Sequence, residues 1–413
     1  MKEYTTRESC RLCSSKKMDL VMDFGTHFVS NFVEEEDHSE YPQAPLVLIF
    51  CDKCKLVQLE HTAPQELLYR RFYWYRSGVT DTMKKALRNI TEEIESLVKL
   101  NSGDVVLDIG SNDGTLLRQY SDKSIVTVGV EPAKNLAAEG AKGVNTFISD
   151  FWTKKVYDEN VYKKAKVITA IGMFYDLEEP NQFISDIEKC LDDEGVFVSQ
   201  LMCLHNMIET NDVGNINHEH LEYYTFESLR YLFENNGLKI DDITVNDTNS
   251  QSYRIYASKK GSSFTPNPGA QERITSVIKM EEKYQSIEGI KEFFDEVAKE
   301  KEKCVSFIES EVAKGKKVWV YGASTKGNTI LQYYGLDSRH LEGAAERSPE
   351  KWGKYTIGTK IMCHSEEVAR KEQPDYFLVL PYTFIKEMYV REKDWRESGG
   401  KFIVPLPKFE VLA

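Results

Sequence analysis

The chain has 413 residues, of which 41% are hydrophobic and 29% charged, and its formal net charge is −13. This composition is typical of a globular protein of two or three domains, and the negative charge argues against a nucleic-acid partner. No apolar run reaches the length of a membrane span, and Met1–Cys10 lacks the apolar core of a signal peptide. We therefore expect a cytoplasmic protein with reduced cysteines and no membrane partner.

Four of the eight cysteines form two C-x-x-C pairs, Cys10/Cys13 and Cys51/Cys54. In a reduced compartment, two such pairs predict a four-thiolate zinc site, which is closed and therefore structural. The alternatives are a redox dithiol and coincidence. A redox pair would normally open a helix in a βαβ unit, which the flanking sequence does not indicate, and coincidence does not explain a pair of pairs.

The segment Val105–Leu117 (VVLDIGSNDGTLL) predicts a buried strand, a glycine turn and a helix start. Such a turn leaves backbone N–H groups and the positive end of a helix facing an open crevice, and glycine allows a ligand to approach the backbone closely. Asp108, Gly110, Asn112 and Gly114 are the candidate contacts. The spacing D-x-G-x-x-x-G is not the G-x-G-x-x-G of dinucleotide enzymes, so a dehydrogenase is disfavoured.

Two acidic positions follow the glycine turn. Glu131 closes the next predicted strand, where a carboxylate can accept hydrogen bonds from both ribose hydroxyls. Asp150 and Phe151 close a third segment and offer an acid and an aromatic ring to an adenine base. The combination is similar to S-adenosylmethionine (SAM) methyltransferases, and a purely structural turn is the alternative.

From Val105 to Ala257 the pattern alternates strands and helices, which predicts a doubly wound α/β sheet. A linker is expected over 258–270, followed by a polar helical stretch over 271–314. The run Val318–Tyr321 then opens a second strand–glycine–helix unit, which predicts a smaller α/β domain. Before these domains, Leu67–Ser77 is unusually aromatic, and its side chains form either core or substrate contacts.

The sequence His218-Glu219-His220 lies in the long connection after the predicted strand Val196–Gln200, on the cofactor side of such a sheet. A metal site is disfavoured because histidines at i and i+2 do not share a helix face. Two readings stay open, hydrogen-bonded structural imidazoles and proton abstraction, and the second suits a group that titrates near neutrality.

These features together resemble the nucleotide-sugar C-methyltransferases of deoxysugar biosynthesis. The resemblance is carried by the four cysteines, LDIGSNDGTLL (Leu107–Leu117), GVEP (Gly129–Pro132), HEHLEYY (His218–Tyr224), YGASTKGNT (Tyr321–Thr329) and PLP (Pro405–Pro407). It implies a zinc-binding domain at 1–66, a Rossmann-like SAM domain at 67–262 and a smaller Rossmann-like α/β domain at 263–413 that helps to hold the nucleotide-sugar. The sequence leaves the oligomeric state open, and a monomer is favoured.

By this resemblance, His220 would be the base and Glu219 its neighbour in the site. Tyr223 and His218 complete the candidate catalytic set, and the candidate substrate contacts are Tyr75, Ser77, Tyr175, Ser252, Arg254 and Lys326. The chain departs from the family at two places. The run Asn249–Gln251 stands where His-Gly-Gly is expected, and Gly172–Asp176 stands for Asn-Val-x-Ala-His, with Tyr175 in place of the histidine.

The expected reaction is methylation of a carbon next to a ketone, because a saturated carbon becomes nucleophilic only when a carbonyl stabilises the carbanion. A 4-keto deoxysugar offers that position at C3, where His220 would remove the proton and a tyrosine (Tyr75, Tyr223 or Tyr224) would donate to the enolate oxygen. SAM carries its own electrophile, so no catalytic metal is expected. The alternatives are an O- or N-methyltransferase of a small metabolite and a non-catalytic SAM-fold subunit.

Overall fold

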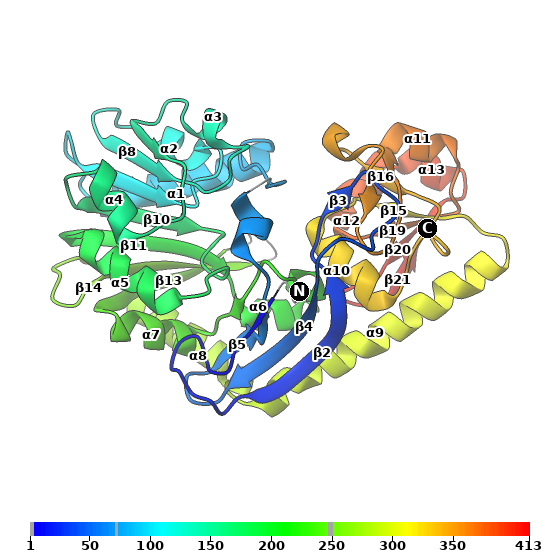
Figure 1. Ribbon diagram of the computed structural model, residues 1–413, viewed down its shortest axis with the longest axis horizontal. Coiled ribbons are helices and arrows are strands. Elements are labelled where there is room, and N and C mark those ends of the chain that lie inside the picture. The colour runs from blue at the N-terminus through cyan, green and yellow to red at the C-terminus, as the bar shows by residue number, and fades with distance from the viewer. Residues whose placement is uncertain (1–3, 71–72, 247–250) are drawn as a thin grey trace.

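The computed structural model describes residues 4–70, 73–246 and 251–413. Its two larger α/β units face each other across the molecule, and the N-terminal strands and one long helix join them below (Figure 1). The departure at Asn249–Gln251 lies mostly outside the described residues. Within the described residues, no helix is both long enough and apolar enough to cross a membrane.

The central sheet has seven strands in the order β13-β14-β11-β10-β7-β8-β9. Its strands are β7 (Val105–Ile109), β8 (Val126–Val130), β9 (Thr146–Ile148), β10 (Ala165–Ile171), β11 (Leu191–Met202), β13 (Leu238–Asn246) and β14 (Ser252–Lys259). β14 runs antiparallel to both of its neighbours, and the other pairings are parallel. Every residue of β7 is buried, as expected for a central parallel strand covered on both faces. The predicted doubly wound sheet is confirmed.

Helices cover both faces of this sheet. They are α1 (Asp81–Leu97), α2 (Thr115–Gln119), α3 (Ala137–Gly140), α4 (Lys154–Asn160), α5 (Pro180–Cys190), α7 (Phe226–Asn235) and α8 (Ala270–Met280). The side chain of Thr80 caps α1 by accepting from the Met83 N–H, and Thr225 and Ser228 form a capping box at α7.

The C-terminal sheet has the order β18-β16-β15-β19-β20-β21. Its strands are β15 (Val318–Tyr321), β16 (Ala344–Glu346), β18 (Cys363–Ser365), β19 (Tyr376–Val379), β20 (Lys401–Val404) and β21 (Glu410–Leu412), with helices α10 (Thr325–Tyr334), α11 (Glu366–Lys371), α12 (Ile385–Arg391) and α13 (Lys393–Glu397). All of its pairings are parallel except β20 with β21. The second α/β domain is therefore confirmed.

The expected single helical stretch before this sheet is two helices. α8 ends at Met280, a 3-10 turn covers Glu282–Gln285, and Ser286 caps α9 (Ile287–Ala313) by accepting from the Gly289 N–H. α9 crosses beneath the molecule from the central to the C-terminal unit (Figure 1). Its buried residues Ile290, Phe293, Phe294 and Val297 repeat at helical spacing, so one face packs on the core.

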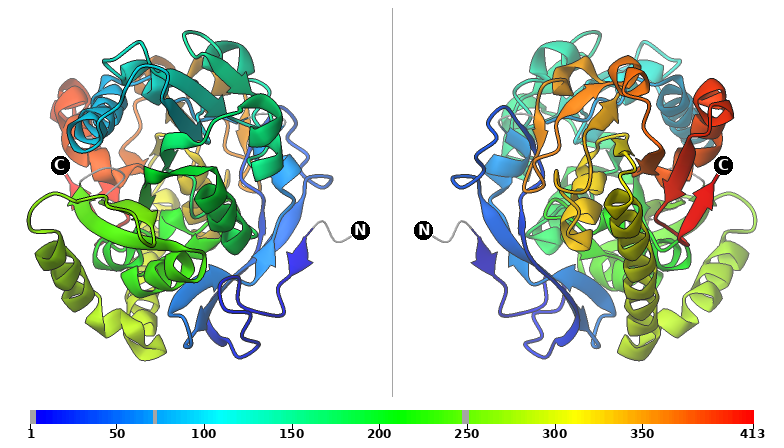
Figure 2. Two further views of the ribbon diagram at one scale, coloured as in Figure 1. Left: turned by 90° about the vertical axis from the view of Figure 1, so that its left-hand side faces the viewer. Right: turned by 90° about the vertical axis from the view of Figure 1, so that its right-hand side faces the viewer.

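The N-terminal sheet, in blue at one side of the views in Figure 2, has the order β12-β5-β4-β2. Its strands are β2 (Asp19–Phe28), β4 (Gln43–Cys51), β5 (Leu56–Leu59) and β12 (Glu222–Tyr223). Smaller pairings join β1 (Thr5–Thr6) to β6 (His61–Thr62) and β3 (Phe32–Val33) to β17 (Tyr355–Thr356). β12 comes from the middle of the chain, so this sheet is completed by the segment that follows His220.

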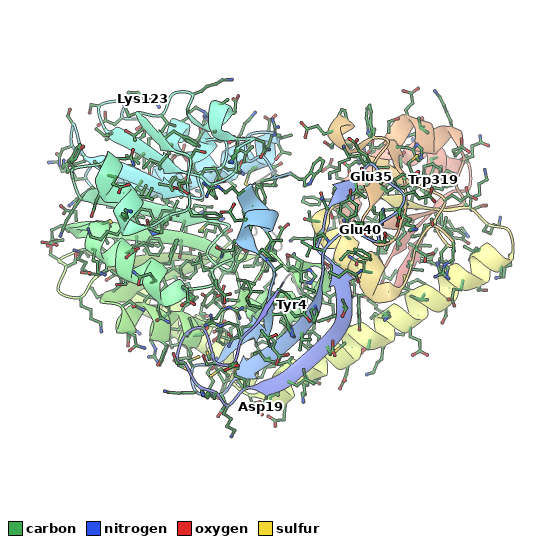
Figure 3. All side chains as sticks on the ribbon, in the orientation of Figure 1. Tyr4, Asp19, Glu35, Glu40, Lys123 and Trp319 are labelled. Atoms are coloured by element: carbon green, nitrogen blue, oxygen red, sulfur yellow. The ribbon has the colours of Figure 1, made fainter. Side chains whose placement is uncertain are left out.

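The N-terminal segment also contacts the C-terminal unit. Figure 3 labels Glu35 on this segment and Trp319 in β15. The Phe28 N–H donates to Gln332 Oε1 at 2.8 Å, and Lys354 pairs with Glu34 at 2.8 Å. Residues of the N-terminal and C-terminal sheets therefore share one hydrophobic core, which also takes in Leu204 and Leu221.

Candidate active site

A cavity of about 340 Å³ lies at the carboxyl ends of β7 and β10. These strands are neighbours, but the chain leaves β7 toward β8 on one side and returns to β10 on the other, so the crevice is a topological switch point. The lining residues come from four regions of the chain. They are Gln65, Tyr69, Tyr73, Tyr75 and Ser77; Ile109, Gly110 and Asn112 with Val130–Pro132; Phe151–Thr153; and Ile171–Met173, Asp176–Glu179, Gln182, Phe183 and Asp186. Such a crevice is where open α/β sheets bind ligands.

The glycine turn brings its backbone close to the cavity. Gly110 has φ +68°, and a Cβ there would lie 2.8 Å from Met173 Cγ, so a side chain would not fit. Asn112 also adopts a positive φ of 52°. Glu131 accepts from the Asn112 N–H at 2.9 Å and from the Ala133 N–H at 2.8 Å, and burial raises its pKa. A carboxylate with four lone-pair sites still has acceptor capacity for a ligand.

Four of the seven predicted cofactor residues line the cavity: Gly110, Asn112, Glu131 and Phe151. Asp108 lies inside β7 and accepts from Thr169 Oγ1 at 2.6 Å, and burial raises its pKa to about 7. Gly114 caps α2, and Asp150 pairs with Arg70 at 3.1 Å. These three therefore support the walls of the cavity and are not part of its lining.

The predicted substrate residues fall into three places. Tyr75 and Ser77 line the cavity, and Asn112 holds both through its side-chain amide, with contacts of 3.1 Å to Tyr75 O and 3.0 Å from the Ser77 N–H. Ser252 and Arg254 lie on β14. The buried guanidinium of Arg254 contacts Gln200 in β11 and both Asn89 and Glu93 in α1. It therefore fastens α1 to the sheet.

Tyr175 and Lys326 approach the predicted catalytic segment. The Tyr175 ring packs edge-on against His220 with centroids 4.7 Å apart. Lys326 reaches this segment from the C-terminal unit. A Cβ added to Gly214 would lie 3.4 Å from both the Cβ and the carbonyl oxygen of Lys326, so the two backbones are close. The charge of Lys326 lowers the pKa of His220.

The two histidines of the His218–His220 segment have different surroundings. His218 is buried, and its Nε2 atom lies 3.0 Å from the carbonyl oxygen of Ala44 in β4, so that nitrogen carries the proton. Burial lowers its pKa to about 4. This contact ties the segment to the N-terminal sheet.

His220 is held through its other nitrogen. Nδ1 lies 2.7 Å from the Asn215 carbonyl, which can only accept, so Nδ1 carries the proton and Nε2 keeps a lone pair. The amide nitrogen of Asn217 lies 3.3 Å from the same Nδ1. Burial first, and then the charge of Lys326, lower the pKa of His220 to about 3. His220 is therefore neutral near pH 7, and among the described residues no hydrogen bond occupies Nε2.

Glu219 and Tyr223 complete the segment. Burial raises the pKa of Glu219 to about 7, and the Tyr69 hydroxyl donates to its carbonyl oxygen at 2.6 Å. The Tyr223 hydroxyl donates within the segment, 3.1 Å from His220 O, and burial raises its pKa well above the usual value. The segment thus places a neutral imidazole beside a carboxyl group that titrates near neutrality.

Sequence analysis did not single out Asp176 as a site residue, although it lines the cavity together with Tyr69 and Tyr73 of the aromatic segment. Asp176 Oδ1 is buried without a hydrogen-bond partner among the described residues, and burial together with Glu219 and Glu222 raises its pKa well above the usual value. Its position just past the carboxyl end of β10, at the switch point, is the signal that would have found it.

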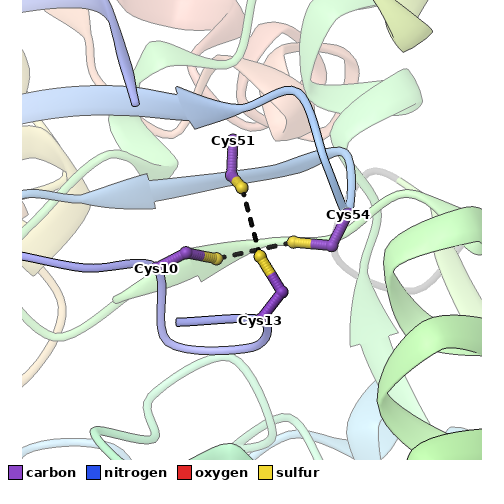
Figure 4. A group of neighbouring side chains, drawn as sticks. All are labelled: Cys10, Cys13, Cys51 and Cys54. Carbon is purple, nitrogen blue, oxygen red and sulfur yellow. Dashed lines mark hydrogen bonds between the residues drawn. The ribbon is translucent and has the colours of Figure 1, made fainter. Parts of the chain in front are cut away.

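The four cysteines converge at the edge of the N-terminal sheet (Figure 4). Their Sγ atoms all lie within 4.8 Å of one another, with Cys10–Cys54 and Cys13–Cys51 at 3.4 Å. A tetrahedral site with Zn–S bonds of about 2.3 Å needs sulfur atoms roughly 3.8 Å apart. The geometry fits a four-thiolate zinc ion without an open position.

Three family models match consecutive parts of the chain: "Putative zinc binding domain" over residues 10–69, "Methyltransferase domain" over 82–243 and "C-methyltransferase C-terminal domain" over 247–407. The curated protein C-methyltransferase NovU of Streptomyces niveus is 28% identical over 414 residues, covering 98% of this chain and 97% of that protein.

Solved structures match over less than half of the chain. Magnesium protoporphyrin IX methyltransferase of Synechocystis PCC 6803 with bound SAH is 14% identical, covers 45% of this chain and 90% of its own, and has a TM-score of 0.34. A SAM-dependent methyltransferase of Clostridium acetobutylicum is 15% identical, with 44% and 94% coverage and a TM-score of 0.35.

The cavity meets the needs of SAM in three respects. It has a glycine-lined approach at Gly110, an acidic side chain at Glu131 and a buried carboxyl oxygen of Asp176 that has no hydrogen-bond partner in the described part of the chain. With the family matches and the four-cysteine cluster, this assigns the chain's class. The chain is a SAM-dependent methyltransferase, in which segments that match a zinc-binding domain and a C-methyltransferase C-terminal domain flank the methyltransferase domain.

Proposed function

We propose that the chain methylates the carbon next to the ketone of a nucleotide-linked 4-keto deoxysugar, at C3, through an enolate. The observation that carries this proposal is the state of His220. Its Nδ1 proton is committed to Asn215, which leaves a neutral Nε2 lone pair on a ring that packs against Tyr175, between the cavity-lining residues Met173 and Asp176 in the chain. A base of this kind is needed when a C–H bond must break before the methyl group can bond to carbon.

We assign SAM to the cavity over Gly110–Asn112, with its ribose hydroxyls accepted by Glu131. When bound, SAM supplies an electrophilic methyl group. The chain's own residues then have to hold the sugar with its C3 proton toward His220 Nε2 and the enolate oxygen toward a donor. Tyr75, which is half-exposed at the cavity, is such a donor. Tyr223 is a poorer one because its hydroxyl donates to His220 O.

We assign the nucleotide of the substrate to the part of the site that the C-terminal unit contributes. Lys326 at the first turn of α10 places a positive charge near His220 from across the molecule, and a cation there suits both a diphosphate and a developing enolate. The low pKa of His220 carries a cost, since a weaker base needs more help from enolate stabilisation. The charge of Lys326 supplies that help.

The experiment is a product analysis. Purified protein is incubated with ¹³C-methyl SAM and a panel of nucleoside diphosphate 4-keto-6-deoxysugars, and the labelled carbon is located by NMR. The proposal requires a methyl group on C3. Proton exchange at C3 in heavy water, with S-adenosylhomocysteine replacing SAM, would detect the enolate directly. A methyl group at another carbon, or acceptance only of a substrate without a ketone, would contradict the proposal.

A further inference from the structure

Arg11 stands between the zinc-cluster cysteines Cys10 and Cys13 and has a fully buried side chain. We call the Cys10–Cys13 turn the zinc knuckle. The guanidinium of Arg11 makes contacts well beyond this turn. Nη1 donates to Leu59 O at 2.5 Å and to Gln58 Oε1 at 3.2 Å, and Nη2 donates to Thr62 Oγ1 at 2.7 Å. The remaining contacts leave the zinc-binding domain.

Two carboxylates of the methyltransferase domain face this guanidinium. Glu178 Oε2 accepts from Nη2 at 3.2 Å and from Nε at 3.3 Å, and Glu222 Oε1 lies 3.8 Å from Nε. Both side chains of the Arg11–Glu222 pair are fully buried. A buried arginine fork that is hydrogen-bonded to one acidic group and lies beside a second restricts the geometry of both.

Both carboxylates belong to parts of the active site. Leu177 and Glu178 line the cofactor cavity, and Glu222 Oε2 accepts from the Leu177 N–H at 3.3 Å. Glu222 itself follows the His218–His220 segment by two residues, in β12. The knuckle backbone adds a further tie, because Asn181 Nδ2 in the first turn of α5 donates to Arg11 O at 2.9 Å and to Leu12 O at 3.0 Å.

The same wall segment is bonded to the catalytic segment. The carbonyl oxygen of Tyr175 accepts from the Leu221 N–H at 2.8 Å and from the Glu222 N–H at 3.0 Å. A continuous set of contacts therefore runs from the zinc knuckle through Arg11 to the cavity wall and on to the residues next to His220. A shift of the wall while the knuckle stays fixed would break the contacts that Glu178 and Glu222 make with Arg11.

We propose that Arg11 is a positioning residue through which the zinc-bound knuckle holds the Leu177–Glu178 wall of the cofactor cavity in its binding geometry. The zinc site then acts on SAM affinity and not only on the stability of its own domain. This inference rests on the assignment of SAM to the cavity and is independent of which sugar is methylated.

The test uses the full-length protein with zinc bound. Arg11→Lys keeps the charge but lacks the fork, and Arg11→Met removes the charge at similar length. The matched control is Lys55→Met, because Lys55 is a cation of the second knuckle whose ion-pair partner is its neighbour Asp52. For each variant, calorimetry measures the SAM Kd, metal analysis measures zinc, and hydrogen exchange measures protection of the Leu177, Leu221 and Glu222 amides.

We expect both Arg11 variants to keep zinc and to raise the SAM Kd about 3- to 30-fold, the range in which residues outside a binding site alter coupling. Exchange should accelerate at the three amides and stay unchanged in β7. Lys55→Met should behave as wild type. If Arg11→Met does not fold, Arg11→Lys decides. A wild-type Kd in a folded, zinc-loaded Arg11→Lys protein overturns the inference.

A Glu131→Ala variant separates this inference from the assignment of the cavity. If Glu131→Ala weakens SAM binding and Arg11→Lys does not, the cavity is correct and the role of Arg11 is wrong. If neither changes the Kd, SAM binds elsewhere and the role of Arg11 at its site falls as well. Loss of zinc from Arg11→Lys, with a SAM Kd restored by added zinc, would also overturn it, because the residue would then act only by retaining metal.

Discussion

At the scale of the residue, the two histidines of one tripeptide differ in which nitrogen keeps its lone pair. His218 uses Nε2 to reach Ala44 in a distant strand, whereas His220 uses Nδ1 within its own loop. The first contact joins two domains, and the second orients the proposed base. Sequence spacing cannot distinguish these roles, because the partner of His218 lies 174 residues away.

We expect His220→Asn to bind SAM and the nucleotide-sugar normally and to lose methyl transfer by about 10²- to 10⁴-fold, since asparagine has no titratable nitrogen. Isotope exchange at the sugar carbon should fall in parallel. His218→Asn is the matched control and should lower thermal stability more than turnover. Steady-state kinetics with calorimetry make the comparison, and near-normal turnover by His220→Asn would show that the base lies elsewhere.

Glu219 is the competing base, and the pH profile separates the two. A base works only when it is deprotonated, so the rate falls as pH drops through its pKa. Burial sets that pKa at about 7 for Glu219 and about 3 for His220. With His220 as base, kcat/KM should stay level within about threefold from pH 5.5 to 8. A tenfold fall per unit below pH 7 that Glu219→Gln abolishes would assign the base to Glu219.

At the scale of the element, local sequence predicted the core of the central sheet well. Val105–Ile109 and the turn after it carry their own signal, an apolar run interrupted only by Asp108 and followed by glycine, and the structure has β7 at those residues. Contacts between distant segments left no such signal. β12 is two residues long and exists because it pairs with β5, and Leu238–Asn246 became an antiparallel strand only through its pairing with β14.

The predicted zinc site can be tested most simply, by measuring bound metal and stability. We expect one zinc ion per chain, and Cys51→Ser should lose it and lower the free energy of unfolding by a few kcal/mol, because metal binding is part of folding here. Cys190→Ser is the control, since Cys190 is equally buried but lies outside the cluster, in α5. Elemental analysis and thermal melts would report both. A zinc-free wild-type protein with four titratable thiols would contradict the assignment.

At the scale of the whole molecule, the candidate site draws on all three domains. The cavity belongs to the central sheet, Lys326 comes from the C-terminal unit, and Ala44 and β5 come from the N-terminal sheet. Sequence analysis listed Lys326 and several of the cavity residues by motif, but not Ala44 or β5. It could not predict that Arg254 forms an ion pair with Glu93, or that Asp176 lines the cavity, because both depend on how separate elements pack.

This division predicts that substitutions in different domains weaken binding of the nucleotide-sugar and of SAM. Lys326→Met should raise the KM for the nucleotide-sugar at least several-fold and leave the SAM Kd unchanged. Glu131→Ala should do the reverse and cost about 1–3 kcal/mol of SAM binding, or roughly one to two decades in Kd. Lys326→Met should also raise the pKa of His220, since it removes a repelling charge. Calorimetry with each ligand separately tests the pattern, and one variant that weakens both ligands equally would contradict it.

The two-residue strand β12 has a consequence for exchanging parts between related enzymes. The matched methyltransferase domain, residues 82–243, contains β12 but not its partner β5, nor the Leu59 N–H that donates to Leu221 O at 2.9 Å. A methyltransferase domain cut at those borders would have the His218–His220 segment but not β5, the strand with which the residues after His220 pair. A working chimera must therefore inherit the N-terminal sheet with the methyltransferase domain, and it must extend past residue 243 to include β14, which pairs with both β11 and β13.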